Sequence, residues 1–326
     1  MKNLIIIITT ILLSTQFIYS QTCTTYYRPS VTFILGEDEK ESDRFYALAK
    51  EYYLTDDVAQ TDYFVDNCRS LHEVRNYLAN RKSDSPWGTV NLVLHGNQWT
   101  GISIPVMPQG ERTTVTSLFA SIQNDEFNSL PDDVADEYTM MNFVSCGLGK
   151  NKDLMYALQL AFGGFDDHKP DVFGSENFVY FNYNERQQVE ISQVKPFYAF
   201  YKTAYKPADL HLRKQLQHKY PKVDIDWLAA MSTKQPSKET NIFHTKFNVP
   251  IQWNVALDVP AERVEIVSEY DKIEFVRAQD DLMEVLDKFD IPIEKFRWQL
   301  SITEQEGKAR VKINGKSTVL CVLTEG

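Results

Sequence analysis

The chain has 326 residues, of which 43% are hydrophobic and 24% are charged, with 13 glycines and 13 prolines. This ordinary globular composition excludes collagen-like, low-complexity and intrinsically disordered classes. The 45 acidic residues outnumber the 34 basic residues and give a net charge of −11. Because the chain lacks the basic character that binding to nucleic acid phosphates requires, we expect no nucleic acid partner.

The first 20 residues predict a signal peptide. Lys2 supplies a positive start, residues 4–13 are an almost unbroken apolar run, and Ser20 is a small residue suited to cleavage. The apolar run is shorter than the ~20 residues that a membrane span needs, and no later segment approaches that length. We therefore expect a secreted or periplasmic protein with no membrane span in the mature chain. An uncleaved anchor is the alternative.

Export makes the cysteine count informative. The chain contains four cysteines: Cys23, Cys68, Cys146 and Cys321. In an oxidising compartment they could form two disulfides. If one of the four is a catalytic thiol, only three remain, and one of these three has no partner for a disulfide. Counting leaves the pairing open.

Short apolar strands alternate with amphipathic helices between residue 31 and about residue 180. Strands are expected at residues 31–35, 62–66, 89–94 and 138–144, with a fifth inside 171–180. Helices are expected at residues 41–54, 71–81, 117–127 and 152–162, the second with Ser70 as N-cap and Glu73 completing a capping box. Residues 98–115 contain prolines and glycines and predict a hairpin insertion above the sheet. This alternation predicts an α/β fold with a doubly wound, mostly parallel sheet.

The remainder of the chain is richer in strands. Aromatic spacing in residues 196–220 indicates helices packed on the sheet. Beyond residue 247 we expect a helix at 279–289, and strands at 250–257, 263–267, 296–303 and 309–323 with a hairpin turn at Asn314-Gly315. The expected division is a signal peptide in 1–20, an α/β domain in 21–240 and a small, strand-rich α+β region in 241–326.

Two strands of the expected sheet end in reactive side chains, His95 after the third and Cys146 after the fourth. Ligands of doubly wound sheets bind outside the carboxyl ends of the strands, and neighbouring strands lie ~4.8 Å apart. An imidazole near a thiol can assist its ionisation and then protonate a leaving amine. The backbone N–H groups of Gly96 and Cys146 are candidate oxyanion donors. The following helix and the nearby imidazole predict a lowered pKa for the Cys146 thiol.

The segments from Leu92 to Gly96 and from Asn142 to Gly147 resemble the caspase-like cysteine peptidases, which include caspases, legumains, clostripains and gingipains. In that family a hydrophobic strand ends in His-Gly and the next ends in the nucleophilic cysteine. The 51 positions between His95 and Cys146 are close to the ~50 of caspases. The resemblance covers about residues 30–180. It implies Cys146 as nucleophile, His95 as general acid and base, and Gly96 as oxyanion donor.

The resemblance also has a limit and a consequence for specificity. Val144-Ser145-Cys146 replaces the Gln-Ala-Cys of caspases, which argues against caspase specificity. The family builds part of its specificity pocket after the nucleophile's helix, where this chain carries Asp166, Asp167, Asp171 and Glu176. Glu176 is the best single candidate for substrate binding, because it falls in the expected fifth strand. A carboxylate there would pair with a basic substrate residue.

These observations together predict an exported cysteine endopeptidase that cleaves protein or peptide substrates through a Cys146–His95 dyad, after basic residues. No cofactor or metal is expected, because the six histidines lack the spacing of a zinc helix and Gly147 to Lys150 lacks that of a phosphate loop. Two alternatives stay open. One is a non-catalytic exported binding protein on a caspase-like scaffold. The other is an acyl hydrolase, although Val144 stands where an α/β-hydrolase elbow requires glycine.

Overall fold

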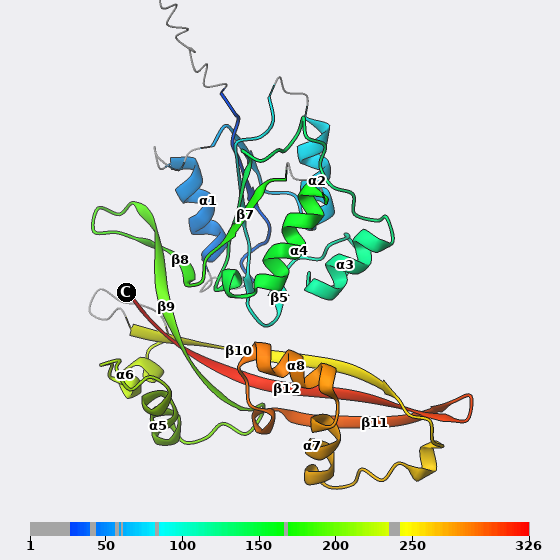
Figure 1. Ribbon diagram of the computed structural model, residues 1–326. Coiled ribbons are helices and arrows are strands. Elements are labelled where there is room, and N and C mark those ends of the chain that lie inside the picture. Colours follow the sequence, from blue (N-terminus) through cyan, green and yellow to red (C-terminus); the bar gives the residue numbers. More distant parts are fainter. Residues whose placement is uncertain are drawn as a thin grey trace, which may run out of the picture.

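The computed structural model describes residues 27–39, 44–55, 59, 61–81, 85–165, 169–234 and 242–325. They form a parallel sheet covered by helices, in the upper part of Figure 1, and a long curled antiparallel sheet below it. The predicted signal peptide, Cys23, Asp166 and Asp167 lie outside the described residues. Within the described ranges, no helix has the length and apolar character needed to cross a membrane.

The parallel sheet has five strands in the order β2-β1-β3-β6-β7. Their bounds are Val31–Ile34 for β1, Tyr63–Val65 for β2, Thr89–Val93 for β3, Met140–Val144 for β6 and Asp171–Gly174 for β7. Each strand overlaps a predicted one, so the prediction of an α/β fold with a parallel sheet is confirmed. Strand β2 lies on one side of β1, and the later strands β3, β6 and β7 lie on the other side. This reversal places a topological switch point between β1 and β3.

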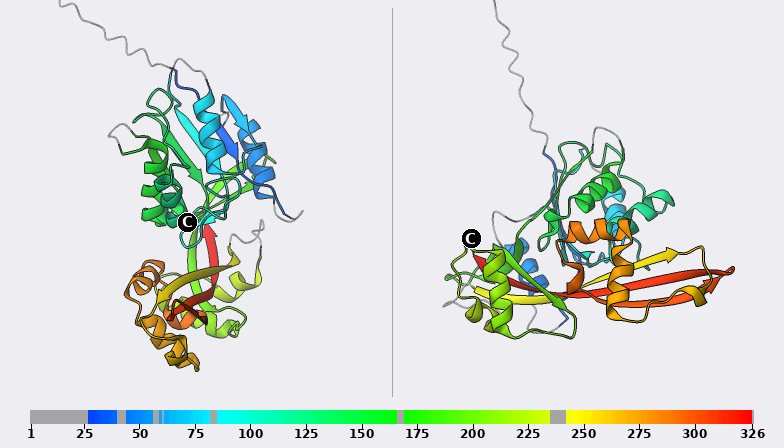
Figure 2. Two further views of the ribbon diagram at one scale, coloured as in Figure 1. Left: turned by 90° about the vertical axis from the view of Figure 1, so that its right-hand side faces the viewer. Right: turned by 60° about the horizontal axis from the view of Figure 1, so that its bottom comes forward.

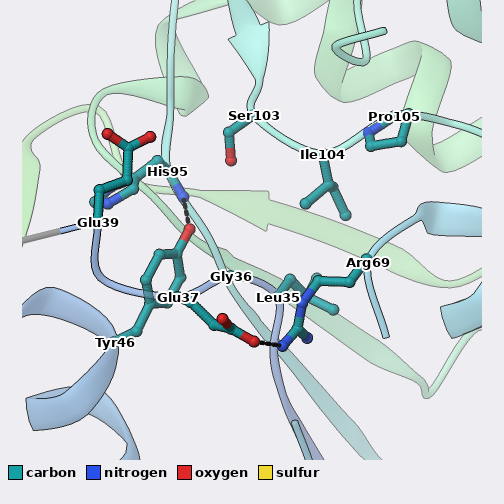
Figure 3. A pocket seen from close by; sticks show the side chains of 10 residues that line it. All are labelled: Leu35, Gly36, Glu37, Glu39, Tyr46, Arg69, His95, Ser103, Ile104 and Pro105. Carbon is teal, nitrogen blue, oxygen red and sulfur yellow. Dashed lines mark hydrogen bonds and ion pairs between the residues drawn. The ribbon is translucent and has the colours of Figure 1, made fainter. Parts of the chain in front are cut away.

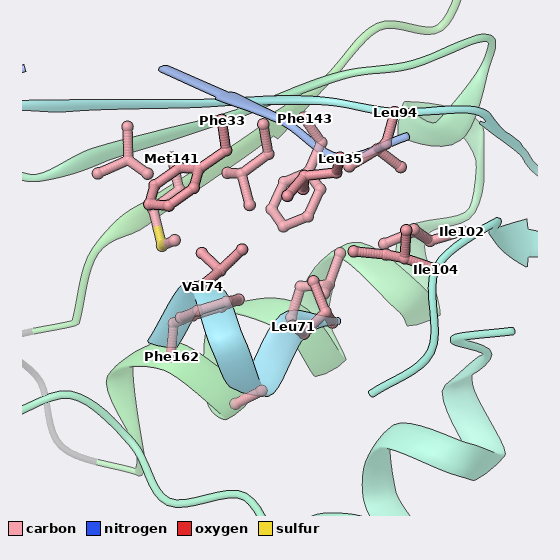
Figure 4. Packing of buried hydrophobic residues seen from close by; sticks show 14 of the residues in the cluster. Phe33, Leu35, Leu71, Val74, Leu94, Ile102, Ile104, Met141, Phe143 and Phe162 are labelled. Atoms are coloured by element: carbon pink, nitrogen blue, oxygen red, sulfur yellow. The ribbon is translucent and has the colours of Figure 1, made fainter. Parts of the chain in front are cut away.

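Helices cover both faces of this sheet. The bounds are Phe45–Thr55 for α1, Leu71–Asn80 for α2, Val115–Gln123 for α3 and Lys152–Gly163 for α4. Helices α2, α3 and α4 share one hydrophobic core with the sheet, in which Leu71 and Val74 face Phe33 and Phe143 (Figure 4). Helix α1 packs on the opposite face. As predicted, Ser70 caps α2, and its side chain accepts a hydrogen bond from the N–H of Glu73.

The predicted insertion after the third strand is a short hairpin of β4 (Gly96–Asn97) and β5 (Gly101–Ile102). Ile102 is fully buried in the main core of the parallel sheet. A single 3₁₀ turn, η1 (Leu148–Lys150), separates Cys146 from α4. The thiol therefore does not lie directly at the start of the α-helix.

The antiparallel sheet has the order β10-β12-β9-β8, with β11 also paired to β12. Its strands are β8 (Phe178–Tyr183), β9 (Val189–Lys202), β10 (Ile242–Ala256), β11 (Arg297–Gln305) and β12 (Lys308–Glu325). Its helices are α5 (Asp209–Lys219), α6 (Trp227–Ser232), α7 (Glu269–Arg277) and α8 (Asp280–Phe289), with 3₁₀ turns η2 (Ala261–Arg263) and η3 (Ile293–Lys295). Figure 2 shows β12 running through the length of this sheet. The sheet already begins at Phe178, upstream of the expected domain division at residue 240.

The prediction of helices across residues 196–220 is wrong for its first part, which is strand β9. Phe197 and Tyr201 pack on one face of the sheet with α5 and α6. Tyr198 and Phe200 pack on the other face. Because both faces are buried, the strand lacks a polar alternation, and its aromatic run is easily taken for a helix face. The second part is helix α5, as predicted.

The predicted hairpin turn at Asn314-Gly315 is also wrong, because β12 runs straight through it. Gly315 instead lies under an indole ring: a Cβ atom there would lie 2.3 Å from the Trp298 ring. The chain reverses at Glu306 and Gly307, whose φ angles of 55° and 73° suit a two-residue hairpin turn. The strand predicted at 263–267 is not formed, and α7 was not predicted.

Candidate active site

A cavity of about 610 Å³ opens at the carboxyl ends of β1 and β3 (Figure 3). It is lined by residues that follow four strands, β1, β2, β3 and β5, and by one helix residue: Leu35, Gly36, Glu37, Glu39, Tyr46, Arg69, His95, Ser103, Ile104 and Pro105. This is the switch point of the parallel sheet, where ligands of doubly wound folds bind. His95 lies on the edge of the sheet that the sequence indicated.

The His95 ring is held by aromatic contacts from α1. It stacks on Phe45 with ring centroids 4.6 Å apart, and meets the Tyr46 ring edge-on at 4.8 Å. The backbone N–H of His95 donates to the Tyr46 hydroxyl at 3.1 Å, and its carbonyl accepts from Ser103 N–H at 2.8 Å. Backbone and ring are therefore both fixed at the cavity wall.

The cavity mouth carries both signs of charge. The Arg69 guanidinium forms an ion pair with Glu37 at 2.6 Å, and the Glu37 side chain is 81% exposed. The Arg69 backbone N–H donates to the Glu73 carboxylate at 2.7 Å. The Arg69 guanidinium also donates to the carbonyls of Asp66 and Cys68 at 2.8 and 2.9 Å. The exposed pair with Glu37 contributes little to stability, whereas the backbone hydrogen bonds hold the guanidinium at the cavity mouth.

Cys146 is a free, partly buried thiol. It packs against the core of the antiparallel sheet, and its Sγ–H donates to the Val179 carbonyl of β8 at 3.3 Å. Burial raises the pKa of the Cys146 thiol to about 11, although the Val179 hydrogen bond opposes the change. The predicted lowering of the thiol pKa is therefore wrong for this resting state, because desolvation outweighs the Val179 hydrogen bond.

The strand register nevertheless places His95 and Cys146 at equivalent positions. Val93 and Val144 are the last pair of the parallel ladder between β3 and β6, and His95 and Cys146 follow two positions beyond these strand ends. The His95 ring contacts Phe45 and Tyr46 of α1. The Cys146 side chain packs against the core of the antiparallel sheet. The hydrogen bond of the Cys146 thiol goes to Val179 and not to the imidazole.

Gly96 and Ser145 pack closely against each other beyond these strand ends. A Cβ atom on Gly96 would lie 2.7 Å from the Ser145 Oγ and 3.0 Å from the Gly101 carbonyl oxygen. Glycine is therefore required for this approach. The Gly147 N–H donates to Asn177 at 2.9 Å, so the amide after Cys146 is already used. Oxyanion donation by the N–H groups of Gly96 and Cys146 stays a prediction.

The structure corrects the reasoning for Glu176. Strand β7 ends at Gly174, so Glu176 lies in the turn before β8 and not in the fifth strand. Its side chain is 60% exposed and forms a 2.7 Å ion pair with Lys152, which lowers the carboxylate pKa. Asp171 is also exposed. The argument for a buried carboxylate that selects basic substrate residues loses its support.

Two features of the site could not be found from the sequence. The first is Tyr46, which contacts the ring and the backbone of His95 across 49 positions. The second is β8, whose Val179 carbonyl holds the thiol and whose Phe181 ring packs on Phe45 at 5.5 Å. Neither carries a local motif. In the described part of the chain, no three His, Cys, Asp or Glu side chains gather as metal ligands.

Comparison of the chain with protein-family models, curated proteins and solved structures found no significant match.

Proposed function

We propose that this protein is an exported cysteine peptidase of the caspase-like kind, with Cys146 as nucleophile and His95 as general acid and base. The observation that carries the proposal is the parallel register of β3 and β6, which sets the strand ends that precede His95 and Cys146 side by side. The 610 Å³ cavity is lined by His95 and offers space for substrate beside it, although Cys146 is not one of the lining residues. Protein or peptide chains are the proposed substrates.

In this mechanism the thiol first leaves the Val179 carbonyl and turns toward His95. With a pKa near 11, the thiol is protonated at neutral pH, so the imidazole takes the proton as sulfur attacks the substrate carbonyl carbon. The imidazolium then protonates the departing amine, which leaves an acyl thioester on Cys146. Water, deprotonated by His95, attacks the thioester and releases the acid product and the thiol.

A fluorogenic peptide library tests the proposal with four proteins. Wild type and Cys68→Ala are expected to hydrolyse the same peptides, because the Cys68 thiol is buried outside the site. Cys146→Ala and His95→Ala are expected to lose at least about 100-fold in rate, the lower end of the contribution of general acid-base groups. Circular dichroism of each variant shows whether it is folded. Hydrolysis that survives in folded Cys146→Ala contradicts the proposal.

A non-catalytic binding protein on the same scaffold is the second candidate. It is favoured by the hydrogen bond that ties the Cys146 thiol to Val179 and by the raised thiol pKa. For such a protein the library gives no hydrolysis with wild type, and no acyl adduct appears on Cys146 in intact-mass measurements. An acyl hydrolase would instead cleave thioester or ester probes while leaving the peptides intact.

A further inference from the structure

A second and larger cavity, of about 1110 Å³, lies between the parallel-sheet half and the antiparallel sheet. Its walls come from the hairpin insertion, the start of α4, strands β9 and β10, and the ends of α5 and α8. Neither His95 nor Cys146 lines it. We call this cavity the inter-sheet groove.

Trp99 is one of the residues that line the inter-sheet groove. Its ring meets Tyr198 edge-on at 4.8 Å and lies 5.5 Å from Phe247, and its indole N–H donates to the Phe289 carbonyl at 2.7 Å. Trp99 itself is 6% exposed. These contacts join the hairpin insertion to the antiparallel sheet and give the groove a firm aromatic floor.

Five lysines and two aspartates line the groove, although the chain has a net charge of −11. Lys219 pairs with Asp290 at 2.6 Å and Lys288 pairs with Asp153 at 2.9 Å. Three of the lysines lie beside aromatic residues. Their Nζ atoms lie over aromatic rings: Lys150 at 5.1 Å from the Tyr198 centroid, Lys195 at 5.6 Å from Phe197 and Lys219 at 4.7 Å from Phe200. All three side chains belong to exposed residues. Partial burial lowers the pKa of Lys150, and the charges of Lys195 and Lys219 act in the same direction. An anionic group placed here would relieve that repulsion.

Residues 250–253 of β10, an edge strand of the antiparallel sheet, line the groove. The His244 N–H donates to Thr233 at 2.8 Å, away from β12. The register with β12 is unbroken from Ile242 to Ala256, so the other even-numbered residues also turn their backbone groups outward. Gln252, which lines the groove, is one of these even-numbered residues. Pro250 is another, and a proline, which has no N–H, is tolerated at an outward position of an edge strand.

We propose that the inter-sheet groove binds an extended peptide segment with acidic side chains. The segment pairs with the outer edge of β10 by strand addition and places carboxylates among Lys150, Lys195 and Lys219. The groove volume exceeds the ~1,000 Å³ upper range of small-molecule sites, which favours a polypeptide occupant over a small organic anion. Binding here does not depend on the proposed peptidase activity, because neither His95 nor Cys146 lines the groove.

Fluorescence anisotropy with a rhodamine-labelled ten-residue peptide of alternating Glu and Val tests this proposal. We expect saturable binding to wild type that weakens at high salt, and no comparable binding of the matching Lys-Val peptide. The Lys150→Gln/Lys195→Gln variant is expected to bind about tenfold more weakly, as follows from losing two exposed charge pairs. Lys312→Gln is the matched control, since Lys312 is an exposed lysine of β12 outside the groove. It should bind as wild type does.

Two N-methylated forms of the acidic peptide test strand addition directly. Only alternate amides of an added strand donate to its partner, so N-methylation of one alternate set should abolish binding and methylation of the other should preserve it. Equal affinity of both forms overturns the proposal, as does unchanged affinity of the double lysine variant. Displacement of the peptide by millimolar acetyl-glutamate would also overturn it in favour of a small-anion site.

The same titration with Cys146→Ala separates this proposal from the proposed peptidase function. The acidic peptide is expected to bind this variant as tightly as it binds wild type. Such binding together with a failed hydrolysis assay would reject the peptidase and retain the groove. Loss of binding in folded Cys146→Ala would overturn the separation of the two sites.

Discussion

Replacing Gly96 by alanine tests the packing that brings the His95 and Cys146 strand ends together. The added Cβ atom would lie 2.7 Å from the Ser145 Oγ and 3.0 Å from the carbonyl oxygen of Gly101. Ser145 has no exposed surface, so its hydroxyl cannot turn into solvent to make room. Overpacking of this kind costs about 1–3 kcal/mol. We expect Gly96→Ala to lower the free energy of unfolding by about 2 kcal/mol.

Ser145→Ala supplies the matched rescue. Among the residues that the structure describes, the buried Ser145 hydroxyl has no hydrogen-bond partner, so its removal should cost little or be stabilising. The double variant lacks the 2.7 Å contact, and the coupling free energy between the substitutions should reach about 1 kcal/mol. Urea unfolding of the four proteins measures it. Additivity within about 0.5 kcal/mol would refute the packing argument.

Three other predictions concern the thiol, the antiparallel sheet and acid stability. The pKa of Cys146 near 11 predicts that its alkylation by iodoacetamide accelerates about tenfold per pH unit up to about pH 10, whereas a plateau near neutral pH would show a lowered pKa. Gly315→Ala forces a Cβ atom to 2.3 Å from Trp298 and should destabilise by at least about 2 kcal/mol in urea, and a neutral effect contradicts that contact. Burial opposes ionisation of Asp136, but the two hydrogen bonds from Arg28 at 2.7 and 2.6 Å prevail and lower the carboxyl pKa. That pair therefore stabilises the fold above about pH 4, and the stabilisation is lost as the pH falls through the lowered pKa. Asp136→Asn should lower the urea midpoint at pH 7, and its effect should shrink progressively on acidification.

The sequence allowed the parallel sheet to be predicted because each unit carries local signals. Strand β1 is a short β-branched run, and α2 begins at Ser70, whose side chain makes the expected cap. The antiparallel sheet was predicted less well, because its signals are not local. The Asn314-Gly315 pair is typical of a hairpin turn. In the structure, the absence of a side chain on Gly315 leaves space for the ring of Trp298 on the neighbouring strand.

The candidate site also has one feature that the sequence predicts and one that depends on tertiary packing. The positions of His95 and Cys146 follow from where two strands end, and strand ends are visible in the sequence. The pKa of the Cys146 thiol does not follow from the positions of the strand ends. Its pKa depends on desolvation by the antiparallel sheet and on a carbonyl 33 positions later in the chain. A motif gives the residue types of a dyad, whereas the protonation equilibrium is set by tertiary packing.

The antiparallel sheet is therefore part of the candidate site and not an appendage to it. Its first strand, β8, supplies the Val179 carbonyl that holds the Cys146 thiol and the Phe181 ring that packs on Phe45, the residue stacked on His95. A weak S–H donor bound to a neutral carbonyl contributes about 1 kcal/mol at most. Rotation of the thiol toward His95 thus costs little, while the greater obstacle to forming a thiolate is its burial. A substrate that brings polar peptide groups beside the thiol makes its surroundings less apolar, so in the proposed peptidase the dyad becomes active when the cavity is occupied.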